Sequence, residues 1–242
     1  MRSLKFLNRK NMSAPDKNFI RKAFDSITPR YDLLNQILSF GMSELWRRRS
    51  AEIVLGDPVF MPESILDLGC GTGKFLECFL HKKAWKNAVG VDFSATMLEK
   101  ARRTVQENVL WLQEDFDRLP FLGSSFDLVI SGFTLRSVQE LSGFLNHVYM
   151  ILTPGGKAVF LDLTRPKSFW ARIFFYPYLK FILPFLGWMI SGKGTAYQFL
   201  SRSVEHFQEP ERTLQEMAQA GFRNCCSKSF AFGAATLMIG QQ

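Results

Sequence analysis

The nine residues 65–73, Ile-Leu-Asp-Leu-Gly-Cys-Gly-Thr-Gly, constrain the fold of this chain more than any other segment. A short apolar run that contains Asp67 leads directly into three closely spaced glycines. Glycine lacks a Cβ atom, so the backbone can turn sharply there and bring its N–H groups close to a ligand. The residues that follow are apolar at the spacing of one helix face: Phe75, Leu76, Phe79 and Leu80. This order of strand, glycine turn and helix is typical of the first half of a doubly wound α/β sheet.

The spacing of the glycines indicates which kind of cofactor the turn would hold. A dinucleotide-binding turn has the pattern G-x-G-x-x-G, whereas this chain has G-x-G-x-G preceded by Asp67. That pattern is closer to a loop that binds S-adenosylmethionine. A glycine-rich turn alone could also be a bare tight turn, so the following strands carry the rest of the argument.

Acidic residues follow the next two predicted strands. The strand 88–91 ends at Asp92, where a carboxylate can accept hydrogen bonds from both ribose hydroxyls of a nucleotide. The strand 109–114 leads to Asp115, which we expect to accept from the adenine amino group, with Phe116 against the ring. Glycine turn and two acids in this order favour a cofactor site over a bare turn.

The helix after the first of these acids belongs to the same site. Ser94 fits an N-cap, and apolar residues at helical spacing follow it, Met97 among them. The residues that we assign to the cofactor are Asp67, Gly69, Gly71, Thr72, Gly73, Asp92, Phe93, Met97, Asp115, Phe116 and Gly132.

Two further apolar runs, 126–130 and 158–161, predict more strands, and the Pro-Gly-Gly turn at 154–156 introduces the second. Near-continuous apolar strands that alternate with helical stretches indicate an α/β fold with a parallel sheet covered on both faces. The 242 residues suit a single domain, 1–242, with an added lid.

Composition limits the remaining classes of function. The formal net charge of +8 is compatible with a nucleic-acid or anionic membrane partner. The densest basic cluster is Arg47-Arg48-Arg49, which we interpret as a solvated helix face. The four cysteines form no C-x-x-C pair and no grouping with histidine, so we expect reduced thiols and no metal. Residues 1–12 lack the apolar core of a signal peptide, which predicts a cytoplasmic protein, with the inner face of the membrane as its possible site.

The segment 169–190 is strongly apolar and aromatic, and its length comes close to that of a membrane span. Two basic residues and two prolines interrupt it, and a charge at the bilayer centre is costly. We therefore expect a pair of helices that lies at the membrane interface or covers the substrate. Ordinary packing in a core or a homodimer, and a true span, are the alternatives. We assign 165–210 as an apolar helical insert over the substrate site.

A series of short motifs extends beyond the cofactor loop. They are Phe24-x-x-Ile27-x-x-x-Tyr31-Asp32-x-x-Asn35, Leu119-Pro120-Phe121, Phe133-x-Leu135-Arg136-x-Val138, Leu152-x-Pro154-Gly155-Gly156, Tyr197-x-Phe199-Leu200 and Ala220-Gly221-Phe222. In these motifs the chain resembles the ubiquinone and menaquinone C-methyltransferases, which methylate a ring carbon of a polyprenylated quinol. Thr134 stands where that family usually has glycine. The resemblance implies a class I S-adenosylmethionine-dependent methyltransferase with a doubly wound, mostly parallel, seven-stranded sheet and an N-terminal helical lid at 1–60.

The resemblance also implies the reaction. A quinol ring carbon becomes a better nucleophile when the adjacent hydroxyl loses its proton, so the protein needs one group that holds an oxyanion and one that accepts a proton. Arg136 is the candidate for the first task, although a guanidinium is a poor base. Tyr31 and Asp32 are its candidate partners from the lid, with His147 and His206 as further candidates.

Demethylmenaquinol is the substrate that we favour. Benzoquinol methylation in ubiquinone synthesis is the nearest alternative. An RNA or small-molecule methyltransferase on the same fold and a non-catalytic cofactor-binding scaffold of a quinone-synthesis complex are the others. Against RNA, the chain has no N-P-P-Y or D-P-P-Y tetrapeptide, so we expect no nucleic-acid partner.

Overall fold

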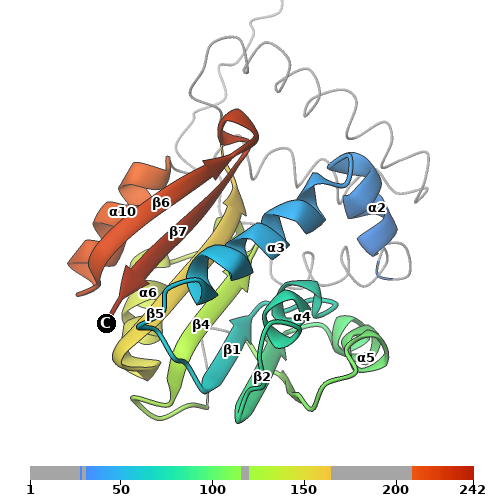
Figure 1. The fold of residues 1–242 in the computed structure, drawn as a ribbon, viewed down its shortest axis with the longest axis horizontal. Coiled ribbons are helices and arrows are strands. Elements are labelled where there is room, and N and C mark those ends of the chain that lie inside the picture. Colours follow the sequence, from blue (N-terminus) through green and yellow to red (C-terminus); the bar gives the residue numbers. More distant parts are fainter. Residues whose placement is uncertain (1–27, 29–30, 116–119, 165–208) are drawn as a thin grey trace, which may run out of the picture.

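The computed structural model describes residue 28 and residues 31–115, 120–164 and 209–242 (Figure 1). Phe116, His206, the segment 169–190 and nearly all of the expected insert at 165–210 lie outside these ranges. The helical lid predicted at 1–60 is described only in part.

A mixed sheet forms the centre of the molecule. Its seven strands have the order β3-β2-β1-β4-β5-β7-β6. They are β1 (Ser64–Leu68), β2 (Asn87–Asp92), β3 (Leu110–Gln113), β4 (Phe126–Gly132), β5 (Leu152–Leu163), β6 (Arg223–Phe230) and β7 (Ala235–Gln241). The first five are parallel to one another, and β7 pairs antiparallel with both β5 and β6. The prediction of a doubly wound, mostly parallel, seven-stranded sheet is confirmed.

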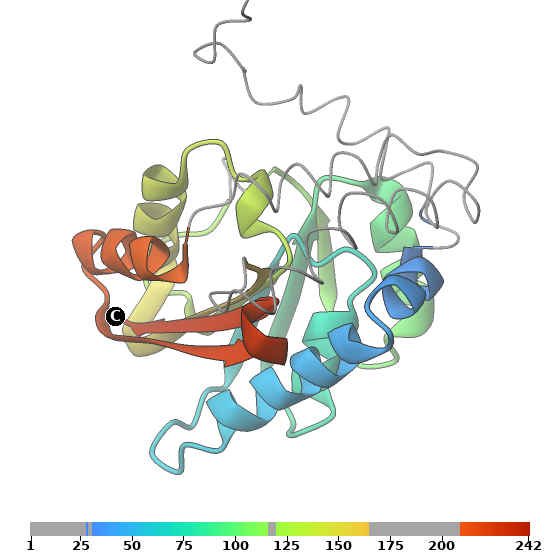
Figure 2. The same cartoon turned by 90° about the horizontal axis from the view of Figure 1, so that it is seen from above.

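Helices cover both faces of the sheet. They are α2 (Tyr31–Leu38), α3 (Met42–Leu55), α4 (Lys74–Leu80), α5 (Ala95–Thr104), α6 (Leu141–Ile151) and α10 (Pro210–Gln219), with short 3-10 turns η2 (Leu135–Ser137) and η4 (Ala231–Gly233). One apolar core joins α3 and α4 to the sheet, and a second joins α6 and α10 to the opposite face (Figures 1 and 2). No helix in the described ranges combines the length and the apolar character that crossing a bilayer requires.

Strand β1 shows how the sequence divides between these two cores. Successive side chains of a strand point to opposite faces. Ile65 therefore packs in the core beneath α3 and α4, whereas Leu66 and Leu68 pack in the other. Asp67 shares its face with Ile65, so the alternation directs this carboxylate toward α3 and α4.

The start of β5 differs from the prediction. Its strand begins at Leu152, before the Pro-Gly-Gly turn, and not after it. Leu152 pairs with Phe126 and Lys157 with Leu128, so the turn is a bulge within the strand. Gly155 takes up the bulge with a φ of +81°, a conformation that L side chains rarely adopt.

The site lies where the strand order reverses. β1 and β4 are neighbours at the centre of the sheet, while β2 and β5 lie on their outer sides. Open α/β sheets bind ligands at the carboxyl ends of the strands at such a switch point. The loops after β1, β2 and β4 therefore define the place to look for a site.

Candidate functional site

The loop after β1 has the shape that its glycines predict. Gly69, Gly71 and Gly73 all have positive φ angles, of +72°, +55° and +79°. A Cβ atom on Gly71 would meet nothing within 4 Å, so the loop leaves open space at this position. Gly73 instead packs closely, because a Cβ there would lie 2.8 Å from Val105 Cγ2. The loop thus exposes its backbone to open space at Gly71, while Gly73 is packed against Val105.

Asp92 holds the loop from the next strand. Its Oδ2 accepts a hydrogen bond from the Gly71 amide at 2.8 Å, and its Oδ1 accepts from the Ser94 amide at 2.9 Å. The side chain is buried. The acid predicted to contact a ribose thus lies beside the glycine loop and orients it.

The helix after Asp92 begins as predicted. The Ser94 hydroxyl accepts from the Met97 amide at 3.2 Å, which confirms Ser94 as the N-cap of α5. Met97 is buried and Phe93 is half-buried. Asp115 follows the end of β3, next to the strand whose last residue is Asp92.

Asp67 is a buried carboxylate without a partner. Its side chain is fully buried, and neither oxygen has a hydrogen-bond partner in the described structure. Burial, with a smaller contribution from the negative charge of Asp92, raises the pKa of Asp67 to about 8. A buried carboxylate without a partner is costly, which makes this position a candidate for binding a cation.

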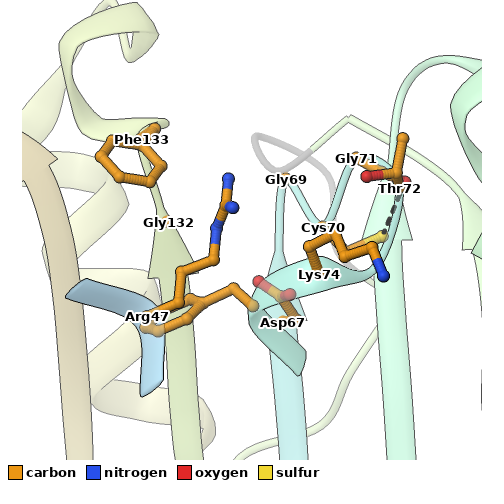
Figure 3. Close-up of a pocket in the computed structure, with 10 residues that line it drawn as sticks. Arg47, Asp67, Gly69, Cys70, Gly71, Thr72, Lys74, Gly132 and Phe133 are labelled. Atoms are coloured by element: carbon orange, nitrogen blue, oxygen red, sulfur yellow. Dashed lines mark hydrogen bonds between the residues drawn. The ribbon is translucent and has the colours of Figure 1, made fainter. Parts of the chain in front are cut away.

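Arg47 was not predicted as a site residue. Its side chain is only 11% exposed, while the side chains of Arg48 and Arg49 are 67% and 63% exposed. The interpretation of the triplet as a solvated face is therefore wrong for Arg47 and holds for the other two. Figure 3 shows its guanidinium extending from α3 into the pocket, between Asp67 and Phe133.

The end of β4 forms the opposite wall. Phe133 has a φ of +62°, an uncommon conformation for a bulky residue, and its ring lies 5.3 Å from the Arg47 guanidinium carbon. Gly132 precedes it and packs against Phe75 so closely that a Cβ would lie 2.9 Å from Cδ1 of that ring. Such strain is common where a binding site fixes the backbone.

The pocket combines predicted and unpredicted residues. It is lined by Arg47, Asp67, Gly69, Cys70, Gly71, Thr72, Lys74, Phe75, Gly132 and Phe133. Five of the assigned cofactor residues thus line it, and Asp92 supports it through Gly71. The described residues contain no cluster of three or more His, Cys, Asp or Glu side chains that could hold a metal ion.

Arg136 has a fixed partner that the sequence did not reveal. Its Nη1 donates to Oδ1 of Asp162, and its backbone amide lies 3.2 Å from Oδ2. The side chains of Arg136 and Asp162 are 8% and 0% exposed. Burial raises the pKa of Asp162, and the charge of Arg136 opposes this effect. The other guanidinium nitrogens of Arg136 have no hydrogen-bond partner among the described residues.

The two lid candidates do not contact Arg136 in the described structure. Asp32 accepts a hydrogen bond from the Thr72 hydroxyl at 2.7 Å and forms an ion pair with Lys100 at 2.7 Å. Tyr31 is the first residue of α2, and its side chain lies outside the description. His147 lies on α6 and does not line the pocket.

Known proteins match this chain in sequence and in fold. Residues 11–242 match the model of the ubiE/COQ5 methyltransferase family. A demethylmenaquinone methyltransferase of Thermus thermophilus is 37% identical over 222 residues, which cover 90% of this chain and 99% of that protein. A ubiquinone/menaquinone biosynthesis C-methyltransferase of Desulfotalea psychrophila is 35% identical, over 91% of this chain and 89% of that protein.

Solved structures agree on the fold. A possible histamine N-methyltransferase of Thermotoga maritima has a TM-score of 0.66 at 19% identity and covers 92% of this chain and 99% of that one. Human N-acetylserotonin methyltransferase in complex with S-adenosylmethionine has a TM-score of 0.56 at 17% identity, over 91% of this chain and 59% of that one. With the family match over nearly the whole length, the chain is an S-adenosylmethionine-dependent methyltransferase that belongs to the ubiE/COQ5 methyltransferase family.

Proposed function

We propose that this protein methylates a ring carbon of demethylmenaquinol, a polyprenylated quinol, with S-adenosylmethionine as methyl donor. The proposal rests on the similarity to the demethylmenaquinone methyltransferase of Thermus thermophilus. That similarity covers 90% of this chain and 99% of the Thermus thermophilus protein. The family model matches over almost the same range. The RNA and scaffold alternatives gain no support from these comparisons.

The pocket residues fit the proposed cofactor. The open space at Gly71 admits a ligand against bare backbone. Asp92 is adjacent, with carboxylate oxygens that can accept from ribose hydroxyls in addition to the Gly71 and Ser94 amides. The unpartnered carboxylate of Asp67 complements a positively charged group. When bound there, S-adenosylmethionine supplies an activated sulfonium methyl group.

Arg136 is the residue that we assign to the quinol. Asp162 fixes one edge of its guanidinium, so the other edge can donate to the oxygen beside the reacting carbon. A guanidinium remains charged in such a site and would stabilise the phenolate as its charge develops. The buried pair thus preorganises the donor.

The benzoquinol reaction is the second candidate. It is favoured by the 35% identity to a protein named for both ubiquinone and menaquinone biosynthesis. Contact of 169–190 with the membrane, and a homodimer, also remain predictions, since that segment lies outside the described residues.

The experiment compares two short-chain quinols under reducing conditions. Purified protein is mixed with methyl-labelled cofactor and either a demethylmenaquinol or the demethylated benzoquinol, and labelled product is measured in a single turnover. We expect the naphthoquinol to be methylated at least tenfold faster. Preference for the benzoquinol would replace the first candidate by the second. Bound cofactor without turnover of either quinol would reject both.

A further inference from the structure

Arg47 and Asp67 place a basic and an acidic side chain in one pocket without pairing with each other. Each is largely or fully buried, and both line the pocket beside the glycine loop (Figure 3). Two charged side chains in a buried site normally form hydrogen-bonded ion pairs, because an unpaired buried charge is costly. The described structure contains no ion pair between these two residues, so the guanidinium and the carboxyl group are each left to a ligand in the pocket.

The other contacts of Arg47 do not satisfy its charge. Among the described residues its acidic partner is Glu44, and the Nη1 to Oε2 distance of 3.8 Å exceeds a hydrogen bond. Its guanidinium carbon also lies 5.3 Å from the centroid of the Phe133 ring. This cation–π contact uses no N–H group of Arg47, and no hydrogen bond from its guanidinium to a described residue is present. Arg47 can therefore donate hydrogen bonds to an anion in the pocket.

Lys74 is the other cation that lines the pocket, and its position differs. Its Nζ donates to Glu77 Oε2 at 2.7 Å within α4. Its charge is therefore already paired on its own helix. Of the two pocket cations, Arg47 is the one available to a ligand.

We propose that Arg47 binds the carboxylate of the amino-acid end of S-adenosylmethionine, while Asp67 binds the ammonium group of the same end. A zwitterion carries the two charges that this pocket leaves unpaired, and the carboxylate matches the planar fork of a guanidinium. This inference rests on the proposed cofactor and not on the identity of the quinol. It makes Arg47 a determinant of cofactor recognition contributed by the N-terminal helices.

The test measures binding, not turnover. Calorimetric titration with S-adenosylhomocysteine, with decarboxylated S-adenosylmethionine and with methylthioadenosine separates the two charges. The first ligand has both charged groups of the amino-acid end, the second keeps only the ammonium, and the third has neither. For Arg47→Met we expect a loss of 10-fold to 100-fold in affinity for S-adenosylhomocysteine and less than 3-fold for the other two. Asp67→Asn should weaken binding of the first two ligands and spare methylthioadenosine.

Two matched variants serve as controls. Arg48→Met removes an exposed arginine from the same helix and should leave all three affinities unchanged, whereas Lys74→Met removes the other cation of the pocket and tests it as the alternative carboxylate site. Equal losses of Arg47→Met for all three ligands would overturn the assignment, because they would indicate a general distortion of the pocket. A selective loss in Lys74→Met instead would transfer the carboxylate site to Lys74. Failure of the parent protein to bind any of the three ligands would overturn the proposed cofactor site itself. If Arg47→Met shows the selective loss but the parent protein methylates no quinol, the result would support this inference and reject only the proposed quinol substrate.

Discussion

The carboxylate of Asp32 accepts a hydrogen bond from the hydroxyl of Thr72 at 2.7 Å and also forms an ion pair with Lys100. One side chain on α2 thus connects the N-terminal helices to the cofactor loop and to α5. Lys100 adds a second link, because its Nζ donates to the carbonyl of Thr28 at 3.2 Å. The position of these helices is therefore coupled to the conformation of the loop.

A double-mutant cycle tests this connection. Asp32→Asn removes the charge, and Thr72→Val removes the hydroxyl at nearly constant volume. Residues in direct contact usually show interaction energies of about 0.5–3 kcal/mol, and we expect a value near 1 kcal/mol in the free energy of unfolding. Chemical denaturation of the four proteins provides the measurement. Strictly additive effects of the two substitutions would show that the contact does not stabilise the folded protein.

Asp92 should determine affinity for the nucleoside part of the cofactor. Asp92→Asn keeps one oxygen that can accept from the Gly71 amide, but it loses the charge that strengthens bonds to ribose hydroxyls. A hydrogen bond to a charged group is worth about 1.5–3 kcal/mol, so methylthioadenosine should bind about 10-fold to 100-fold more weakly. Calorimetry measures the change, with Asp57→Asn, an acid remote from the pocket lining, as the control. Unchanged affinity would disprove the ribose assignment.

Asp67 should make the cofactor-free protein less stable as the pH rises. Its pKa in the folded protein is about 8, above the usual value of about 3.9 in an unfolded chain. The folded state therefore retains a proton that the unfolded state releases between about pH 4 and pH 8. The bound proton makes its full contribution to the free energy of unfolding below about pH 4. That contribution decreases as the pH rises to about 8, by up to about 1.4 kcal/mol per pH unit.

Asp67→Asn supplies the comparison, because an amide does not titrate. Chemical denaturation at pH 6 and at pH 8 should show the stability advantage of the variant over the parent growing with pH. A pH-independent difference between the two proteins would contradict the assigned pKa.

The buried pair of Arg136 and Asp162 complicates a simple test of catalysis. Arg136→Ala leaves a buried carboxylate without its cation, which costs about 3–5 kcal/mol of stability. We expect this variant to melt far below the parent, so lost activity alone would prove nothing. The double variant Arg136→Gln with Asp162→Asn replaces the charges by amides that can pair.

This double variant should recover most of the stability and cofactor affinity, yet lose about 10²-fold or more in single-turnover rate, as expected for a removed oxyanion contact. Thermal melts and labelled-methyl transfer on the same samples give both quantities. A folded double variant with near-normal turnover would remove Arg136 from the mechanism.

The local pattern of the sequence predicted the central sheet and the cofactor loop well. The glycine turn and the Ser94 cap depend on interactions within a few residues. Strands β1, β2 and β4 are almost fully buried, so each is visible as a short apolar run although its pairing is long-range. Strand β6 is different, since most of its residues are exposed. The sequence of β6 has no apolar alternation that would predict its pairing with β7. The prediction of seven strands therefore came only from the family resemblance.

The sequence contained a signal for Arg47 that the interpretation of the basic triplet missed. Residues three or four positions apart share a helix face. Arg47 is four residues before Ala51 and seven before Val54, two apolar residues that are buried in the structure. Arg48 and Arg49 fall outside this face. The partner of Arg136 could not be found in this way, because Asp162 lies on β5, 26 residues further along the chain.

The contact between Gly69 and Thr134 has a consequence for the natural variation of this protein. A Cβ atom on Gly69 would lie 2.7 Å from both Cγ2 and Oγ1 of Thr134. Alanine at position 69 would therefore need a smaller residue at position 134. It would also have to adopt the positive φ of +72° that Gly69 has. These two sites, 65 residues apart in the chain, should change together among homologues. Glycine at position 134 removes the steric conflict with alanine at position 69, so we expect alanine there together with glycine, and not with threonine, at position 134.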